Sequence, residues 1–162
     1  MSTRQVRQII RGTAKGRHFT VIASQFNPTL THALVKGAVN TLRKAGAAPS
    51  NIEIVWVAGA FELPVMAARA VKAYPRPDAV VALGALVRGE TAQYAVIAHA
   101  VSQGLMQVSV ASAIPVTFGV IVAETLAQAK ARAGGNLGNR GSEAAEAALS
   151  VLAADYGPRT MG

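Results

Sequence analysis

The sequence predicts an α/β fold of three layers (αβα), in which helices cover both faces of a four-stranded, mainly parallel sheet. One observation is that short apolar segments alternate with helix-like segments along the chain, in units of about 30 residues. Another is that the third apolar segment shows no polar alternation, as expected for a strand buried on both faces. With 162 residues, the chain has the length of one domain with a sizeable core.

The first unit begins with a strand predicted over Phe19–Ser24, which is rich in β-branched and aromatic residues. Asn27 is suited to cap a following helix, and Pro28 is suited to its first turn. Apolar residues then recur at helical spacing over residues 29–45, and Gly46 ends that pattern. The unit is therefore predicted as a strand followed by an amphipathic helix.

The second and third units repeat this order. A strand is predicted over Ile52–Val57, and Pro64 opens a helix that runs to about residue 73. The third strand is predicted over residues 79–84, all of them apolar or glycine, and a helix follows over residues 91–108.

The last part of the chain supplies one more strand and two helices. The strand is predicted to begin at residues 115–120, and the helices cover residues 125–133 and 143–154. Ser142 is predicted to cap the second of these helices. The glycine-rich segment 134–141 between them is predicted to be a mobile joint.

The composition shows a shortage of charge. Hydrophobic residues make up 51% of the chain and charged residues only 15%, whereas about 25% is usual. No apolar run approaches the roughly 18 residues of a membrane span, and none fits a signal peptide. The absence of cysteine excludes disulfides and thiol chemistry and fits a cytoplasmic location. We therefore expect a homo-oligomer whose apolar surface faces other subunits, with no membrane partner.

The net charge of +8 is concentrated near the N-terminus, because eight of the 16 basic residues precede Glu53, the first acidic residue. Residues 1–17 are predicted to form a flexible basic arm, and residues 18–162 a single domain. Such an arm can bind nucleic acid, a membrane surface or an acidic partner. No aromatic residue lies among its arginines and no nucleic-acid motif follows, which favours a solvated terminus and makes nucleic acid an unexpected partner.

Ligands of parallel sheets bind beyond the carboxyl ends of the strands. Phe26 follows the first predicted strand, and Phe61 and Glu62 follow the second. The two rings either hold a flat heterocycle or belong to the core. The Glu62 carboxylate either binds hydroxyl and ring N–H groups or favours the N-terminus of the following helix.

The end of the third strand predicts an anion site. Ala85 and Gly89 allow the backbone to approach a ligand closely, and Glu90 and Thr91 lie where the next helix begins. The N–H groups of that helix end are suited to phosphate, although a plain turn is the alternative. No P-loop and no GxGxxG segment follows any strand, which argues against nucleotide sites of those two kinds.

Few other residues carry distinctive chemistry. Arg132 and Arg140 flank the glycine-rich segment and either reach a phosphate or form solvated helix ends. His18, His32 and His99 share no metal-ligand spacing. We therefore expect no metal and no cofactor.

Taken together, the strand ends resemble the lumazine synthase family. The similarity rests on six segments in the family's order: Phe26-Asn27, 57–64 (VAGAFELP), 82–91 (ALGALVRGET), 115–120 (PVTFGV), 128–134 (QAKARAG) and 138–145 (GNRGSEAA). The resemblance implies a flavodoxin-like fold and a transferase of riboflavin biosynthesis. That enzyme condenses 5-amino-6-(D-ribitylamino)uracil with 3,4-dihydroxy-2-butanone 4-phosphate to give 6,7-dimethyl-8-ribityllumazine.

The resemblance also implies roles for individual residues. Phe26 would stack on the pyrimidine, and Phe118 and Arg132 would come from a neighbouring subunit. The ring and ribityl chain of the first substrate would be held by Ala60, Phe61, Glu62, Ala85, Leu86 and Val87. The phosphate of the second substrate would be bound by Glu90, Thr91 and Arg132.

Gln93 departs from the family pattern, which has a proton-transferring histidine at this position. Glutamine does not titrate near neutral pH and cannot serve as a general acid or base. Because proximity and orientation contribute much of the rate, we expect a slower synthase. The alternative is a catalytically impaired shell or a flavin- or lumazine-binding paralogue. The family assembles as pentamers, decamers or sixty-subunit icosahedral shells, and riboflavin synthase is a partner that the resemblance suggests.

Overall fold

The computed structural model describes residues 13–154, so most of the predicted basic arm, residues 1–12, lies outside the described residues. Its middle layer is a four-stranded sheet in the order β2-β1-β3-β4. The strands are β1 (Phe19–Ser24), β2 (Ile52–Val57), β3 (Ala79–Val87) and β4 (Val116–Ala123). All three pairings between neighbouring strands are parallel. The predicted four-stranded parallel sheet is confirmed.

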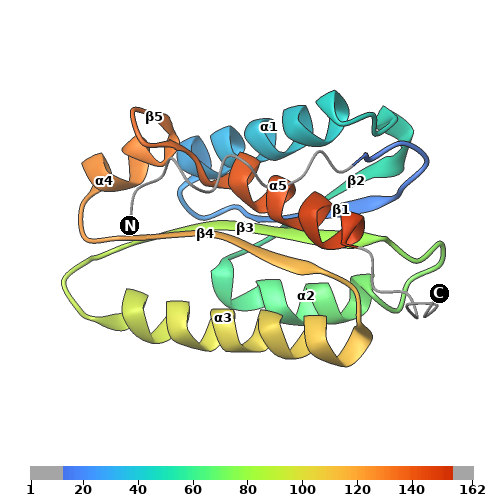
Figure 1. Cartoon of the computed structure of the whole chain (residues 1–162). Coiled ribbons are helices and arrows are strands. Elements are labelled where there is room, and N and C mark those ends of the chain that lie inside the picture. The colour runs from blue at the N-terminus through green and yellow to red at the C-terminus, as the bar shows by residue number, and fades with distance from the viewer. Residues whose placement is uncertain (1–12, 155–162) are drawn as a thin grey trace, which may run out of the picture.

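Helices cover both faces of this sheet (Figure 1). On one face lie α1 (Pro28–Lys44) and α5 (Arg140–Ala153), and on the other lie α2 (Leu63–Ala70) and α3 (Gln93–Ser112). Successive residues of a strand point to opposite faces, so Val21 and Ile22 of β1 enter two different apolar clusters. The chain thus has a core on each side of the sheet, and the predicted αβα layering is confirmed.

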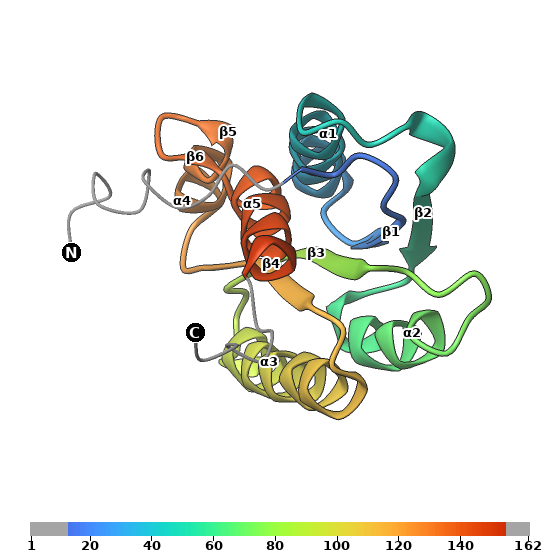
Figure 2. The same ribbon diagram turned by 45° about the vertical axis from the view of Figure 1, so that its right-hand side comes forward.

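The predicted mobile joint at 134–141 is wrong, because these residues are ordered by backbone hydrogen bonds. After α4 (Leu126–Ala131), the strands β5 (Ala133–Gly135) and β6 (Gly138–Asn139) form an antiparallel hairpin. The N–H of Leu137 donates to the carbonyl of Ala131 at 2.9 Å, which ties the hairpin to the helix before it. Figure 2 shows the hairpin and α4 beside the ends of α1 and α5.

Two predicted helix caps are also corrected. Ser142 does not cap α5; the cap is Asn139, whose Oδ1 accepts the N–H groups of Gly141 at 2.8 Å and Ser142 at 3.1 Å. The amide of Asn139 also donates to Ala33 of α1 at 3.0 Å, which joins the two helices. Asn27 precedes α1 but its side chain makes no cap hydrogen bond.

Element bounds differ from prediction where tertiary pairing decides them. β3 runs on to Val87, three residues beyond the predicted end, because β4 continues to pair with it up to Ala123. Ala85, Leu86 and Val87 therefore belong to a strand and not to a loop. α2 ends at Ala70, and two short 3₁₀ helices, η2 (Pro49–Asn51) and η3 (Ala60–Glu62), flank β2.

The N-terminal end of the described chain packs against the domain. Ala14 is fully buried, and its N–H donates to the carbonyl of Ala45 at 2.9 Å. The Arg17 guanidinium donates to the carbonyl of Leu152 near the end of α5. Among residues 13–154, no helix has both the length and the apolar character needed to span a membrane.

Candidate functional site

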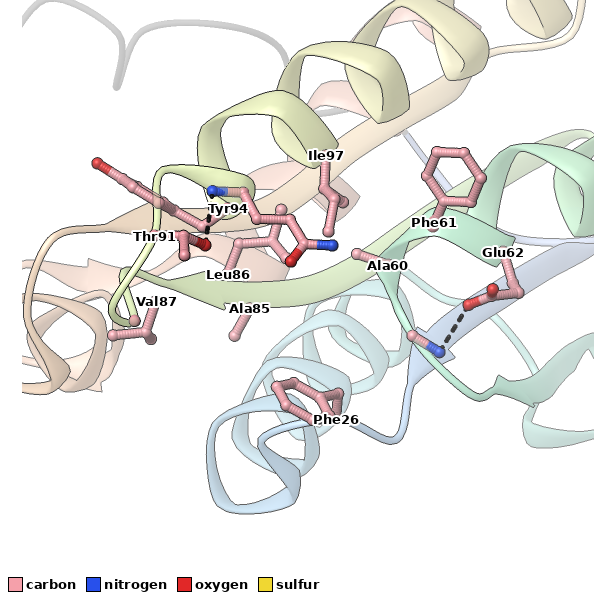
Figure 3. A pocket seen from close by; sticks show the side chains of 13 residues that line it. Phe26, Ala60, Phe61, Glu62, Ala85, Leu86, Val87, Thr91, Tyr94 and Ile97 are labelled. Atoms are coloured by element: carbon pink, nitrogen blue, oxygen red, sulfur yellow. Dashed lines mark hydrogen bonds between the residues drawn. The ribbon is translucent and has the colours of Figure 1, made fainter.

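The carboxyl ends of β1, β2 and β3 surround a pocket of about 360 Å³, within the usual range for small-molecule sites. Figure 3 shows Thr91 and Tyr94 at one end of it, Phe61 and Glu62 at the other, and Phe26 across from Ala85. The lining is mostly apolar, with a few polar groups. It consists of Phe26, Gly59, Ala60, Phe61, Glu62, Ala85, Leu86, Val87, Gly89, Thr91, Gln93, Tyr94 and Ile97.

Phe26 lies in the turn between β1 and α1. Its N–H donates to Ala58 at 3.2 Å, and that of Gln25 donates to Val57 at 2.8 Å, so the turn is joined to the end of β2. The ring is 69% exposed, and that of Phe61 is 64% exposed. Neither ring belongs to the core of the described chain, and both line the pocket.

The segment after β2 forms the short helix η3, with Ala60 buried and Phe61 exposed. The Glu62 carboxylate accepts the N–H of Gly59 at 2.9 Å, a bond that Figure 3 marks with a dashed line. This bond closes the turn and holds the carboxylate at the edge of the pocket. One carboxylate oxygen remains able to accept a hydrogen bond from a ligand hydroxyl.

The β3–α3 segment supplies the polar end of the pocket. Thr91 and Gly89 line it, and the N–H of Gln93 is 3.4 Å from the Thr91 hydroxyl oxygen. α3 begins at Gln93, two residues later than predicted, so its N-terminal end lies beside the pocket, which Gln93 and Tyr94 line. The positive end of the dipole of this 20-residue helix favours an anion here.

The whole chain can now be compared with known proteins. Residues 16–155 match the sequence profile of 6,7-dimethyl-8-ribityllumazine synthase. The chain belongs to the lumazine synthase family. It is 47% identical over 138 residues to the 6,7-dimethyl-8-ribityllumazine synthase of Gemmatimonas aurantiaca, an alignment that covers 85% of this chain and 84% of that relative.

Nine of the residues singled out by the resemblance to lumazine synthases line the pocket, and three do not. Glu90 is exposed in the loop beside it. Phe118 lies on β4 and Arg132 at the end of α4, and neither lines the pocket of its own subunit. These are the two residues that the resemblance assigns to a neighbouring subunit.

Three lining residues were not predicted: Gly59, Tyr94 and Ile97. Helical spacing could have found Ile97, which lies one turn beyond Gln93 on α3. Tyr94 follows Gln93 directly and carries a phenol to the same end of the pocket (Figure 3). Both depend on the point where α3 begins, which the sequence placed two residues too early.

Within residues 13–154, Glu62 is the one charged residue that lines the pocket. In the described part of the chain, no group of three His, Asp or Glu side chains could hold a metal ion. Among the described residues, the N-terminal end of the α3 dipole is the feature beside the pocket that favours an anion.

Proposed function

We propose that this protein condenses 5-amino-6-(D-ribitylamino)uracil with 3,4-dihydroxy-2-butanone 4-phosphate to 6,7-dimethyl-8-ribityllumazine, in riboflavin biosynthesis. The observation that carries the proposal is that nine residues singled out by the resemblance, which lie at or after the ends of three strands, line one pocket. Membership of the lumazine synthase family supports it.

The apolar half of the pocket suits the uracil. The exposed ring of Phe26 offers a face for stacking, and the buried end of β3 at Ala85 and Leu86 offers an apolar wall. Glu62 is held at the edge by its bond to Gly59, where its free oxygen can accept from ribityl hydroxyls. A flat heterocycle with a polyhydroxyl chain therefore matches both the shape and the polarity of this half.

The polar half suits the phosphate of the second substrate. The Thr91 hydroxyl, the N-terminus of α3 and the backbone at Gly89 supply donors and a favourable dipole. Arg132 from a neighbouring subunit would supply the missing positive charge, and Phe118 from that subunit would add a second aromatic wall.

Gln93 lines the pocket at the start of α3, next to Thr91. Its amide can donate and accept hydrogen bonds but cannot take up a proton. The amine of the uracil, the ketone and the leaving phosphate would react mainly because they are held together, with water carrying the protons. Proximity of this kind can contribute about 7–11 kcal/mol, whereas a proton-transfer group contributes about 10²–10⁴-fold.

A steady-state assay with both substrates tests the function. We expect lumazine formation and phosphate release in equal amounts, above the rate of the mixed substrates alone. Product at only the uncatalysed rate, from a protein that still binds the uracil, would contradict the proposal. That result would favour the impaired shell or binding paralogue, which Gln93 motivates.

The proposal includes a homo-oligomer, a pentamer or an assembly of pentamers, located in the cytoplasm, with riboflavin synthase as a further partner. Apolar residues exposed along α3 and β4 support association between subunits. They are Val96, Met106, Val110, Phe118 and Val122. An apolar surface of this extent is more typical of a subunit interface than of a monomer.

A further inference from the structure

Asn27 is a polar residue directly after the pocket residue Phe26, and it does not form the helix-cap hydrogen bond that the sequence predicted. It has a left-handed backbone conformation, with φ of 58° and ψ of 60°, directly after Phe26 and before α1. Its side chain leaves the helix uncapped and instead reaches β3, where Nδ2 donates to the carbonyl of Ala85 at 3.0 Å. Asparagine tolerates this backbone conformation better than most residues.

The bond to Ala85 occurs where the sheet itself no longer joins these two segments. The pairing of β1 with β3 ends at Ala23 and Leu83, two residues before Ala85. Beyond that point, the Asn27 amide is the link between the turn after β1 and the end of β3. Because Phe26 precedes Asn27 and lines the same pocket as Ala85, this link sets the separation of two opposite walls.

The turn is held on its other side by main-chain bonds to Val57 and Ala58 of the β2 segment. Those bonds do not depend on any side chain of the turn. Of the two attachments of the Phe26 segment, therefore, only the one to β3 can be removed by a substitution at a single side chain.

We propose that Asn27 is a positioning residue for the heterocyclic substrate, acting through the Ala85 carbonyl on the placement of Phe26. This inference rests on the proposed function for the identity of that substrate. Asn27 need not touch the substrate, and its effect is confined to the half of the pocket that holds the ring. Its loss should weaken binding of the uracil and leave the phosphate half of the site unchanged.

The test compares Asn27→Gly and Asn27→Asp with the wild-type protein. Glycine adopts the left-handed conformation without strain but has no amide, whereas aspartate keeps the shape and presents an acceptor to the Ala85 carbonyl. Loss of one hydrogen bond between neutral groups corresponds to about a 2- to 12-fold change in affinity. We expect weaker binding of 5-amino-6-(D-ribitylamino)uracil in an equilibrium titration of that substrate alone, with aspartate weaker than glycine.

Ala113→Gly is the matched control, because Ala113 is the other non-glycine residue with positive φ in the described chain and lies at the far end of α3. It should leave uracil binding unchanged. In turnover, the Asn27 variants should raise KM for the uracil and leave KM for the butanone phosphate and kcat unchanged. Thermal unfolding of each variant reports whether the fold persists.

Unchanged uracil binding in folded Asn27 variants would overturn the proposal, as would an equal rise in both KM values. Wild-type protein that binds the uracil but forms no product would contradict the synthase function. The titration of the Asn27 variants would still support or refute the Asn27 inference. Wild-type protein that does not bind the uracil at all would overturn both.

Discussion

Gln93 is the pocket residue at which the sequence resemblance indicates a departure from the family pattern. It lines the pocket at the first turn of α3, beside Thr91. Its amide can orient a substrate group or a water molecule but adds no titrating group. The rate and the pH dependence of catalysis should therefore both respond to the residue at this position.

Gln93→His is expected to raise kcat, by up to about 10²-fold, because an imidazole can transfer protons within the pocket. An ordinary imidazole has a pKa of about 6.5, so the variant should also acquire a change in activity near that pH that the wild type lacks. Initial rates measured from about pH 5 to about pH 9 check both effects, because this interval includes the pKa of an imidazole.

Asn40→His is the control, since it introduces the same side chain at an exposed position of α1, outside the pocket and away from the apolar residues exposed on α3 and β4. It should not alter kcat. An unchanged kcat in Gln93→His itself would show that proton transfer at this position does not limit the reaction.

At the scale of elements, α1 and α5 are joined by contacts that leave no space for an added methyl group. A Cβ at Gly141 would overlap the carbonyl of Leu34 on α1. Backbone atoms cannot move aside as the end of a flexible side chain can. The first turn of α5, which follows the hairpin after α4, is therefore held directly against α1.

Gly141→Ala is expected to lower the free energy of unfolding by about 2–3 kcal/mol, because overpacking forces the two helices apart. For a chain of this length, that corresponds to a Tm lower by roughly 5–10 °C. Glu146→Ala, at an exposed position of the same helix, should change the stability by less than about 0.5 kcal/mol. Equal Tm values for the two variants would contradict the close packing.

Helices and strands were predicted well where local composition decides their bounds, and poorly where pairing with another part of the chain decides them. β1 and β2 have the predicted bounds because β-branched runs with clear breakers define them. The hairpin after α4 was missed because Gly134 and Gly138, both at positive φ, form turns that a glycine-rich sequence also shows in a mobile loop. The extra length of β3 comes from its pairing with β4, which no local pattern reveals.

The same reason explains how much of the site could be predicted. Phe26, Phe61 and Thr91 were found because strand ends of a parallel sheet lie at one edge, whichever helices follow. Tyr94 and Ile97 were missed because their orientation depends on where α3 begins. The placement of Phe118 and Arg132 in a shared site depends on a second subunit, whose position a single chain does not define.

At the scale of the whole molecule, the proposed site is completed by two subunits. Phe26→Ala should disable the part of the site that a subunit supplies to its own pocket, and Arg132→Ala the part supplied to its neighbour. In a 1:1 co-assembly, a site is intact only when both contributions are wild type, so about a quarter of the wild-type activity should return. Co-expression of the two variants, with the native mass measured for the assembly, checks this.

Recovery of no activity, from an assembly shown to contain both variants, would place Arg132 and Phe26 in the same subunit's site. Full activity of the Arg132→Ala protein on its own would remove Arg132 from the site. A native mass equal to that of one chain would contradict the oligomer itself.

The lone carboxylate of Glu62 among the lining residues has a consequence for how activity depends on the amount of protein. An isolated subunit presents a doubly negative phosphate with a pocket whose one formal charge is also negative. If a neighbouring subunit supplies Arg132, as proposed, productive binding requires association first, and association obeys mass action. Specific activity should fall when the protein is diluted below the dissociation constant of its assembly. The turnover rate of each chain then depends on the concentration of the protein itself.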